Sequence, residues 1–318
     1  MPTQLLCALL AMLAATSACH AQVWPQRAVR LIVSLGPGSG ADIGARLLAD
    51  RLAKRWSQPV VVENRPGGDS VVAITSVLNA NDDHILLSSP SSSFIAHPYT
   101  HARMPYDAAQ LMPVVRVSNT IISASVPAAS GIASMAGLVD AARKEPGKLN
   151  FAAATGLTDF QYQVFLRATG ISMVRVPYRD TVQALNDLGE SRIHFYTSAF
   201  AITRPLVESG KVRVIALINS QRAELLKGIP TVREAGYAML EFDGLVGLFS
   251  APIVPPAVRE RIAADVIEAM KDPMVIDRLT ATGQIINPGG PAEFAASIAQ
   301  QRAGAAETAK ALGLKRAE

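Results

Sequence analysis

Two hydrophobic patterns take turns along most of the chain: short apolar runs, and longer stretches in which apolar residues recur every three or four positions. Val29–Val33 is mostly apolar and β-branched, which is typical of a strand covered on both faces. In the stretch that follows, Ile43, Leu47, Leu48 and Leu52 recur at roughly helical spacing, with charged residues between them. Further strands are expected at residues 60–62, 84–87, 114–117, 121–126, 149–153, 174–176, 193–196, 212–218 and 245–249. The alternation predicts an α/β fold with largely parallel sheets.

The first residues follow neither pattern. Residues 5–15 form an unbroken apolar run, which is too short to cross a membrane and suits the core of a signal peptide. Because the run is followed by small residues, we expect residues 1–21 to be removed before Gln22. No Lys or Arg precedes the run, and residues 16–19 resemble a lipoprotein box, which leaves lipidation of Cys19 open. Both cysteines, Cys7 and Cys19, lie in this segment, so the mature protein would have neither a disulfide nor a cysteine nucleophile.

Composition narrows the class of protein. The 318 residues are 49% hydrophobic and 18% charged, which suits one large or two medium globular domains. The net charge is +4, but there is no basic run and only 5% of residues are aromatic, so a nucleic-acid partner is not expected.

Several expected strands end in turns rich in Gly, Ser or Thr, each followed by a helix start. These turns are residues 36–40, 88–93, 154–158, 178–181 and 197–198. In α/β sheets, ligands bind beyond the carboxyl ends of strands, and a helix N-terminus offers N–H groups and a positive dipole end to an anion. The first turn matches neither the dinucleotide nor the phosphate-binding glycine motif, and Ser39-Gly40-Ala41-Asp42 also fits a capping box that serves only the helix. Five such turns together favour a cleft for a small carboxylate.

Catalytic and metal-binding alternatives find little support. The chain has no G-x-S-x-G motif. His97 and His101 are spaced as a helical metal-binding pair, but Pro98 lies between them and no third ligand is evident, so a solvent-exposed loop is expected. Asp82-Asp83 is interpreted as a solvated turn rather than an acid/base pair. We therefore expect no catalytic residue, no metal and no cofactor.

Several strings in the chain are similar to one known family. The most specific are V-V-E-N-R-P-G at residues 61–67 and P-T-V-R-E-A-G at residues 230–236. Trp24-Pro25, the turn ending in Gly40-Ala41-Asp42, and strings at residues 105–107, 146–149, 176–179 and 210–213 agree in order. The whole mature chain thereby resembles the solute-binding receptors of tripartite tricarboxylate transporters, the Bug or TctC family.

The resemblance implies a two-lobed periplasmic-binding-protein fold, type II-like, with two doubly wound sheets and an interdomain cleft. Residues 22–123 with 246–318 would form lobe 1 and residues 124–245 lobe 2, with crossings near residues 123–126 and 244–249. The protein would be a periplasmic monomer that binds a small carboxylate and contacts membrane transporter subunits transiently. By position, the ligand contacts would be Gly36, Gly38, Ser39, Gly40, Ala41, Asp42, Ser89, Ser91, Ser92, Thr155, Gly156, Thr158, Tyr178, Asp180 and Thr197. One ligand carboxylate would meet N–H groups around residues 38–41, with hydroxyls from Ser91 and Thr158.

Four positions depart from the family pattern, and they leave the ligand's identity open. Leu157 adds bulk in the turn at residues 155–158, and Gln161 stands where His is frequent. Asp180 replaces a usual glycine and adds negative charge beside the expected anion site, while Thr197 replaces a usual aspartate. Two alternatives also stay open: a receptor that presents its ligand to a membrane sensor kinase, and, less favoured, a secreted hydrolase.

Overall fold

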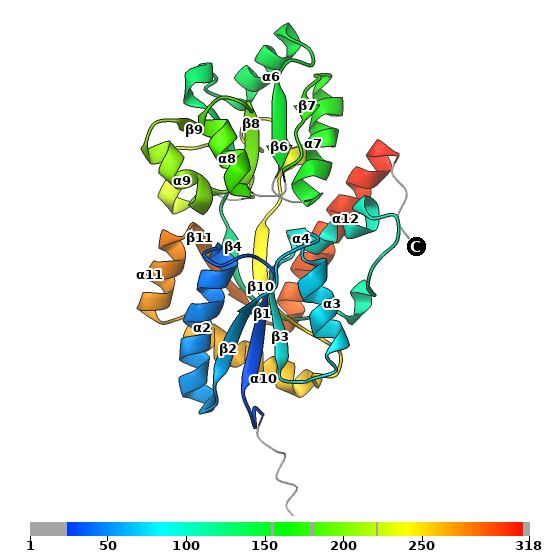
Figure 1. Cartoon of the computed structure of the whole chain (residues 1–318), viewed down its shortest axis with the longest axis vertical. Helices are drawn as coiled ribbons and strands as arrows, with labels where there is room; N and C mark the ends of the chain where they lie inside the picture. The colour runs from blue at the N-terminus through cyan, green and yellow to red at the C-terminus, as the bar shows by residue number, and fades with distance from the viewer. Residues whose placement is uncertain (1–23, 154–155, 179–180, 221, 314–318) are drawn as a thin grey trace, which may run out of the picture.

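The computed structural model of the chain describes residues 24–153, 156–178, 181–220 and 222–313. The expected signal peptide with Cys19, and the expected contacts Thr155 and Asp180, lie outside these residues. The described elements form two α/β blocks stacked along the long axis of the molecule (Figure 1). We call the block around the six-stranded sheet lobe 1 and the block around the five-stranded sheet lobe 2.

Lobe 1 is a six-stranded sheet with helices on both faces. Its strands are β1 (Val29–Val33), β2 (Val60–Asn64), β3 (Ile85–Pro90), β4 (Met112–Thr120), β10 (Gly244–Ser250) and β11 (Gln284–Gly289), in the order β11-β4-β10-β3-β1-β2. Its helices are α2 (Gly40–Trp56), α3 (Val71–Asn79), α4 (Ser92–Ile95), α5 (His97–Thr100), α10 (Pro256–Ala269), α11 (Pro273–Ala281) and α12 (Pro291–Leu312), with a 3-10 turn at Ala108–Gln110.

Lobe 2 has a five-stranded sheet. Its strands are β5 (Ile122–Pro127), β6 (Asn150–Ala153), β7 (Val174–Arg175), β8 (Phe195–Ala199) and β9 (Val212–Leu217), in the order β7-β6-β8-β5-β9. Its helices are α6 (Met135–Lys144), α7 (Gly156–Thr169), α8 (Thr181–Gly189) and α9 (Phe200–Glu208), with 3-10 turns at Ala128–Ser130, Glu224–Leu226 and Ala238–Leu240.

The two sheets repeat one topology. In lobe 1, β1 pairs in parallel with β2 and β3, and β10 enters antiparallel between β3 and β4. In lobe 2, β6 pairs in parallel with β7 and β8, and β5 enters antiparallel between β8 and β9. The α/β fold is as predicted, but the prediction of largely parallel sheets is wrong. β10 and β5 are antiparallel to their neighbours because each arrives from the other lobe and enters its sheet from the opposite end, and β11 is also antiparallel to β4 at the edge of lobe 1.

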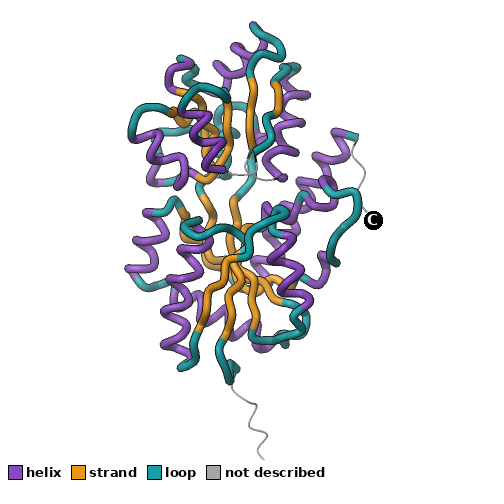
Figure 2. Tube along the Cα trace, viewed as in Figure 1, coloured by secondary structure: helices purple, strands orange, loops and turns teal. Residues whose placement is uncertain are grey.

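The chain passes between the sheets twice, along neighbouring paths (Figure 2). It leaves lobe 1 after Thr120 and enters β5 at Ile122, then returns through Asp243 into β10. Residues 123–126 and 244–249, where crossings were expected, lie inside β5 and β10. The exchange points therefore lie a few residues before the expected lobe boundaries.

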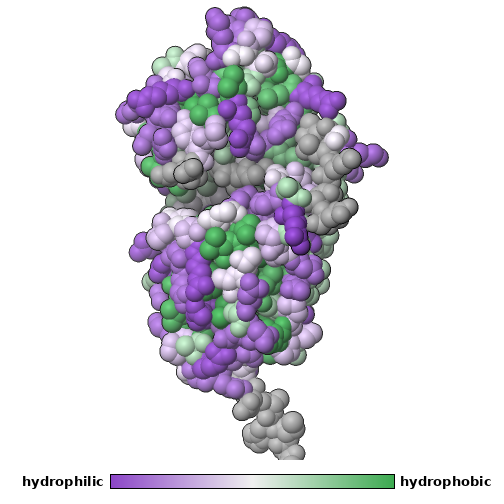
Figure 3. Space-filling view, turned by 45° about the vertical axis from the view of Figure 1, so that its right-hand side comes forward, coloured by the Kyte–Doolittle hydropathy of each residue, from purple (hydrophilic) through white to green (hydrophobic). Residues whose placement is uncertain are grey.

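Strand β1 shows how the hydrophobic pattern builds the core of lobe 1. Val29, Leu31 and Val33 pack with α2 and α10 on one face of the sheet, while Ile32 packs on the other face. All four are buried, as expected for a central strand whose two faces are both covered. The visible surface is mostly polar, with small apolar patches on both lobes (Figure 3).

Aromatic side chains connect the two lobes. Tyr99 of α5 stacks on Phe160 of α7, with ring centroids 5.7 Å apart. The long helix α12 runs from lobe 1 alongside α7 (Figure 1), where Arg167 Nη1 donates to the carbonyl of Ala311 at 3.1 Å. One apolar cluster is thereby continuous through both lobes.

Gly247 of β10 is the position where the core of lobe 1 leaves no room for a side chain. A Cβ there would lie 2.4 Å from the carbonyl oxygen of Val115 and 2.5 Å from the ring of Phe294, which is fully buried. We expect Gly247→Ala to lower the free energy of unfolding by about 1–3 kcal/mol, since the backbone of β4 must move. Gly304→Ala in α12 is the matched control, because a Cβ there meets nothing within 4 Å. Urea unfolding of both variants checks this; equal midpoints would contradict it.

Candidate functional site

The carboxyl ends of the parallel strands in the two lobes face each other. β1 and β3 run toward lobe 2, and β6 runs toward lobe 1 (Figure 1). Helix α2 begins on the lobe 1 side of this junction, and α7 begins on the lobe 2 side. Ligands of α/β proteins bind beyond the carboxyl ends of strands, so this junction is the candidate site.

The turn before α2 uses part of its own hydrogen-bonding capacity. Ser39 is the N-cap, and its Oγ accepts from the N–H of Asp42 at 3.2 Å. The N–H of Gly38 donates to Asp42 Oδ2 at 2.9 Å, and the N–H of Ser39 donates to the carbonyl of Gly36 at 3.3 Å. Gly40 and Ala41 are the first two helical residues, whose N–H groups have no intrahelical carbonyl to bind. These two N–H groups are the donors that the turn offers to a ligand.

Asp42, one of the expected ligand contacts, has a structural task in the turn. Its carboxylate is 3% exposed and accepts from Gly38, from Arg46 and from Asn64 Nδ2 at 2.8 Å. Burial alone would raise the pKa of this carboxyl, but the hydrogen bonds from Arg46, Gly38 and Asn64 outweigh burial and lower the pKa below its usual value. Asp42 thus fixes the shape of the turn: its N–H donates to Ser39 Oγ as in a capping box, but its carboxylate accepts from Gly38 rather than from the N–H of Ser39.

The lowered pKa of Asp42 predicts a pH-dependent contribution to stability. The ionised carboxylate stabilises the fold above the unfolded-state pKa of about 3.9, and this contribution is lost as the pH falls through the lower folded-state pKa. We expect Asp42→Asn to lower the free energy of unfolding at pH 7 by about 1–3 kcal/mol. The difference between the two proteins should shrink as the pH falls below about 4. Urea unfolding at several pH values measures it; a constant difference would contradict the charge-based explanation.

The serines after β3 are mostly committed to partners within lobe 1. Residues 88–90, expected in a turn, belong to β3, where Ser89 Oγ accepts from Ser34 Oγ at 2.8 Å and donates to the carbonyl of Pro90 at 3.2 Å. Ser91 is fully buried and its Oγ donates to Gln301 Oε1 of α12 at 2.8 Å. A hydroxyl has one proton, so in this geometry Ser91 cannot donate to a carboxylate as expected. Ser92 is also buried, at the first position of α4.

On the lobe 2 side, the helix start expected after β6 is present. Gly156 is the first residue of α7, and Thr158 lies buried in the same turn. Tyr178, in contrast, is turned toward its own lobe: its hydroxyl donates to Asp187 Oδ2 of α8 at 2.7 Å. Burial and this hydrogen bond raise the pKa of Tyr178 to about 12, so the hydroxyl keeps its proton for Asp187.

Thr197 lies in the middle of β8 rather than at a helix start, because α9 begins only at Phe200. It pairs with Ala153, the last residue of β6, and is 1% exposed. Among the described residues its Oγ1 has no hydrogen-bond partner. A buried hydroxyl without a partner is costly, and it marks a place where a ligand or water completes the structure. Of the expected site residues, Thr197 is the one whose buried hydroxyl has no partner in the described part of the chain.

Sequence reasoning missed Gln284, the first residue of β11. Its side chain is 2% exposed and lies beside the N-terminus of α2, although the two are far apart in the sequence. Its Oε1 accepts from the hydroxyls of Ser118 and Thr120, and its Nε2 has no partner in the described part of the chain. A single glutamine at a strand start carries no local signal, so only the three-dimensional contact reveals it.

A large cavity lies away from the α2 turn. It is a cavity of about 740 Å³ between α12, α7 and residues 238–243, and none of the expected contact residues lines it. Its wall includes Leu157 and Gln161, two of the positions that depart from the family pattern. Arg116 also lines it and donates to the carbonyl of Asn287 at 2.8 Å and to Ser297 Oγ at 2.7 Å.

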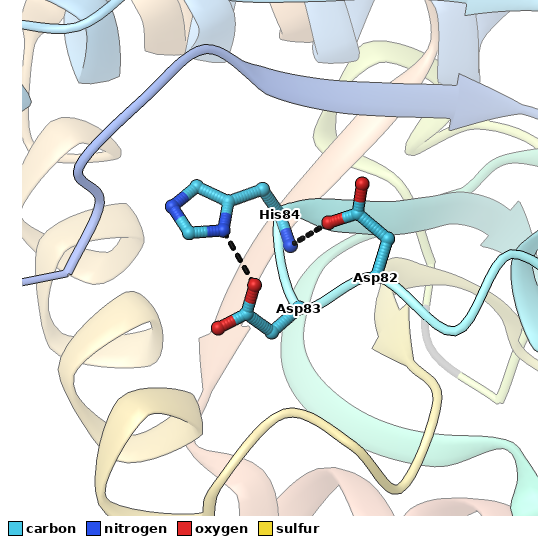
Figure 4. Close-up of side chains that lie close together, drawn as sticks. All are labelled: Asp82, Asp83 and His84. Carbon is cyan, nitrogen blue, oxygen red and sulfur yellow. Dashed lines mark hydrogen bonds and ion pairs between the residues drawn. The ribbon is translucent and has the colours of Figure 1, made fainter.

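The cluster of Asp82, Asp83 and His84 has the composition of a metal site (Figure 4). Its side chains, however, form hydrogen bonds with other groups of the protein. Arg27 donates to both oxygens of Asp82, at 2.7 and 3.2 Å, and this pair lowers the pKa of Asp82. His84 Nδ1 lies 2.6 Å from Asp83, and His84 Nε2 accepts from the N–H of Gln26 at 3.2 Å. The cluster therefore holds the segment before β1 against lobe 1.

The prediction of a solvent-exposed loop at His97 and His101 is wrong for His97. His97 begins the short helix α5 and is fully buried, with its Nδ1 2.8 Å from the hydroxyl of Tyr106 and its Nε2 3.0 Å from the carbonyl of Asp69. Both ring nitrogens have partners, so His97 is a core residue.

Within the described ranges, no helix is long and apolar enough to span a bilayer.

Comparisons with known proteins agree with this architecture. A family model described as "Tripartite tricarboxylate transporter family receptor" matches residues 44–313. A Pseudomonas sp. (strain P51) protein from the tcbD-tcbE intergenic region, classed as UPF0065, is 29% identical over 291 residues, which cover 89% of this chain and 86% of the relative.

Two solved structures are similar over nearly the whole chain. One, described as a periplasmic transporter, is 28% identical with a TM-score of 0.82, covering 92% of this chain and 99% of the other. The R. palustris protein Rpa4515, solved with adipate, is 26% identical with the same TM-score and the same coverage. The chain therefore has the same two-lobed arrangement as these two solved structures.

Proposed function

Because the chain belongs to the family of tripartite tricarboxylate transporter receptors, we propose that it is a solute-binding protein that holds a small carboxylate between its two lobes. The observation that carries the proposal is the junction of the strand ends, where the open N–H groups of Gly40 and Ala41 lie on one lobe and the unpartnered hydroxyl of Thr197 on the other. These groups supply donors and no fixed charge.

A carboxylate suits such a donor set. Removing an ionised carboxylate from water is very costly unless hydrogen-bond donors replace the lost water. Hydrogen bonds to a charged group contribute about 1.5–3 kcal/mol each, and the dipole of a helix N-terminus adds to them. The bound adipate of the R. palustris relative supports a dicarboxylate, whose two ends could engage the two lobes.

The remaining properties are proposed together. The protein would act in the periplasm after removal of residues 1–21, as a monomer that passes its ligand to transporter subunits by transient contact. We propose that residues 24–120 with 244–313 form lobe 1 and residues 122–243 form lobe 2, because the chain passes between the sheets at these points. We propose binding without catalysis, since the groups gathered at the junction are N–H donors and hydroxyls.

A thermal-shift screen over straight-chain mono- and dicarboxylates tests the proposal. A ligand that binds only the folded state stabilises it by about 2.7 kcal/mol at a concentration a hundredfold above its Kd. At least one acid should raise the melting temperature, and its neutral diamide should not. Absence of a shift with every acid would contradict carboxylate binding, and turnover of an ester would favour the hydrolase instead.

Uptake measurements separate the two possible membrane partners. If the protein serves a transporter, deleting its gene should abolish uptake of the acid found in the screen. If it serves a sensor kinase, uptake should persist while the transcriptional response to that acid is lost.

A further inference from the structure

Gln284 holds a buried amide whose nitrogen is unused. The side chain is 2% exposed, and its Oε1 accepts from Ser118 Oγ at 2.8 Å and from Thr120 Oγ1 at 3.2 Å. Because both hydroxyls donate to Oε1, the Nε2 atom points away from them, and no described residue accepts a hydrogen bond from Nε2. Buried donors are nearly always paired in folded proteins, so this one calls for an acceptor that the chain itself does not supply.

The free nitrogen points at the N-terminus of α2. Nε2 lies 2.5 Å from the place that a Cβ on Gly40 would take, so only a glycine lets the amide come so near. Gly40 and Ala41 are the helical residues whose N–H groups face no intrahelical carbonyl. The neighbouring donor, the N–H of Gly38, is already taken by Asp42. The amide and the two N–H groups therefore form one set of donors.

We propose that Gln284 Nε2 and the N–H groups of Gly40 and Ala41 form one carboxylate subsite, with Gln284 as a ligand-contacting residue that determines specificity. This inference rests on the proposed function. The two oxygens of a carboxylate accept several hydrogen bonds, so one carboxylate satisfies all three donors. An ammonium group in the same place would meet only donors and be rejected, because it can accept nothing.

The position of Gln284 also connects the subsite to the contact between the lobes. The preceding residue, Gly283, accepts from the N–H of Ile121 at the crossing, at 2.8 Å. A Cβ on Gly283 would lie 3.3 Å from the backbone nitrogen of Ala201 in α9 of lobe 2. A carboxylate held by Gln284 would therefore lie beside the point where lobe 1 meets lobe 2.

Two substitutions test the role of the amide. Gln284→Glu keeps an oxygen that can accept from Ser118 and Thr120, and it replaces the NH2 donor by a carboxylate oxygen. The negative charge of this carboxylate repels a carboxylate ligand. Gln284→Leu removes the amide altogether. Gln163→Glu and Gln163→Leu, at an exposed position of α7, are matched controls. Binding of dicarboxylates from malonate to sebacate is measured by isothermal titration calorimetry, with the melting temperature of each ligand-free protein.

We expect Gln284→Leu to weaken binding at least about tenfold and Gln284→Glu about a hundredfold, with the Gln163 variants within about twofold of wild type. If Gln284→Leu folds poorly, the isosteric Gln284→Glu carries the test. Unchanged affinity of Gln284→Glu would overturn the inference and indicate that the amide only packs against α2, while leaving the proposed function standing. A wild-type protein that binds none of these acids would overturn both.

Discussion

Replacing Gly40 by valine is expected to weaken carboxylate binding by about a hundredfold or more, which is the loss of two charge-assisted hydrogen bonds. Gly40 is the first residue of α2, and its N–H is one of the two donors of the turn that face no intrahelical carbonyl. A valine side chain would cover this end of the helix and displace the amide of Gln284, which lies 2.5 Å from the position of the new Cβ. Isothermal titration with the best acid from the screen measures the loss.

The fold should tolerate this change, because Gly40 does not have a positive φ and the atom that it meets is the far end of a flexible side chain. Gly290→Val is the matched control: Gly290 also begins a helix, as the N-cap of α12, and a Cβ there meets nothing within 4 Å. Wild-type affinity of Gly40→Val would show that the ligand does not use the N-terminus of α2.

Thr197→Val is expected to act in opposite directions on stability and on binding. The ligand-free protein should become more stable by up to about 1–3 kcal/mol, since a buried hydroxyl without a partner is replaced by a methyl group of the same shape. Binding of the acid should weaken by about tenfold or more, because the donor from lobe 2 is lost. Melting temperatures without ligand and titrations with ligand measure the two effects separately.

Thr203→Val provides the comparison for a threonine whose hydroxyl is used. Thr203 is fully buried, and its Oγ1 lies 2.8 Å from Ser198 Oγ. This variant should lose stability and keep its affinity for the acid. If Thr197→Val instead loses stability and binds like wild type, Thr197 belongs to the core and not to the site.

The sequence was sufficient where the signal is local. The apolar run of β1 and the capping residues Ser39 and Asp42 lie within a few positions of what they determine, and the structure has the strand and the start of α2 at those positions. The same local reasoning misplaced Thr197, since a Thr-Ser pair is favourable both at a helix start and inside a buried strand.

Hydrogen bonds to residues of other helices and strands could not be predicted from the sequence. Ser91 looked free to bind a ligand, but its proton goes to Gln301 of α12. Tyr178 was expected to face the cleft, but Asp187 holds its hydroxyl. Gln284 gave no local signal because its environment is built by β4 and by α2. A side chain's hydrogen bonds are decided by tertiary contacts, so sequence spacing predicts where turns lie better than which hydroxyls remain available.

A crystal structure with the dicarboxylate that raises the melting temperature most shows directly whether the ligand binds at the α2 turn or in the cavity beside α12. We expect one carboxylate within hydrogen-bond distance of the N–H groups of Gly40 and Ala41, with the other end directed toward Thr197. A ligand seated instead in the cavity beside Arg116 and α12, with the turn at Gly40 unoccupied, would contradict this expectation.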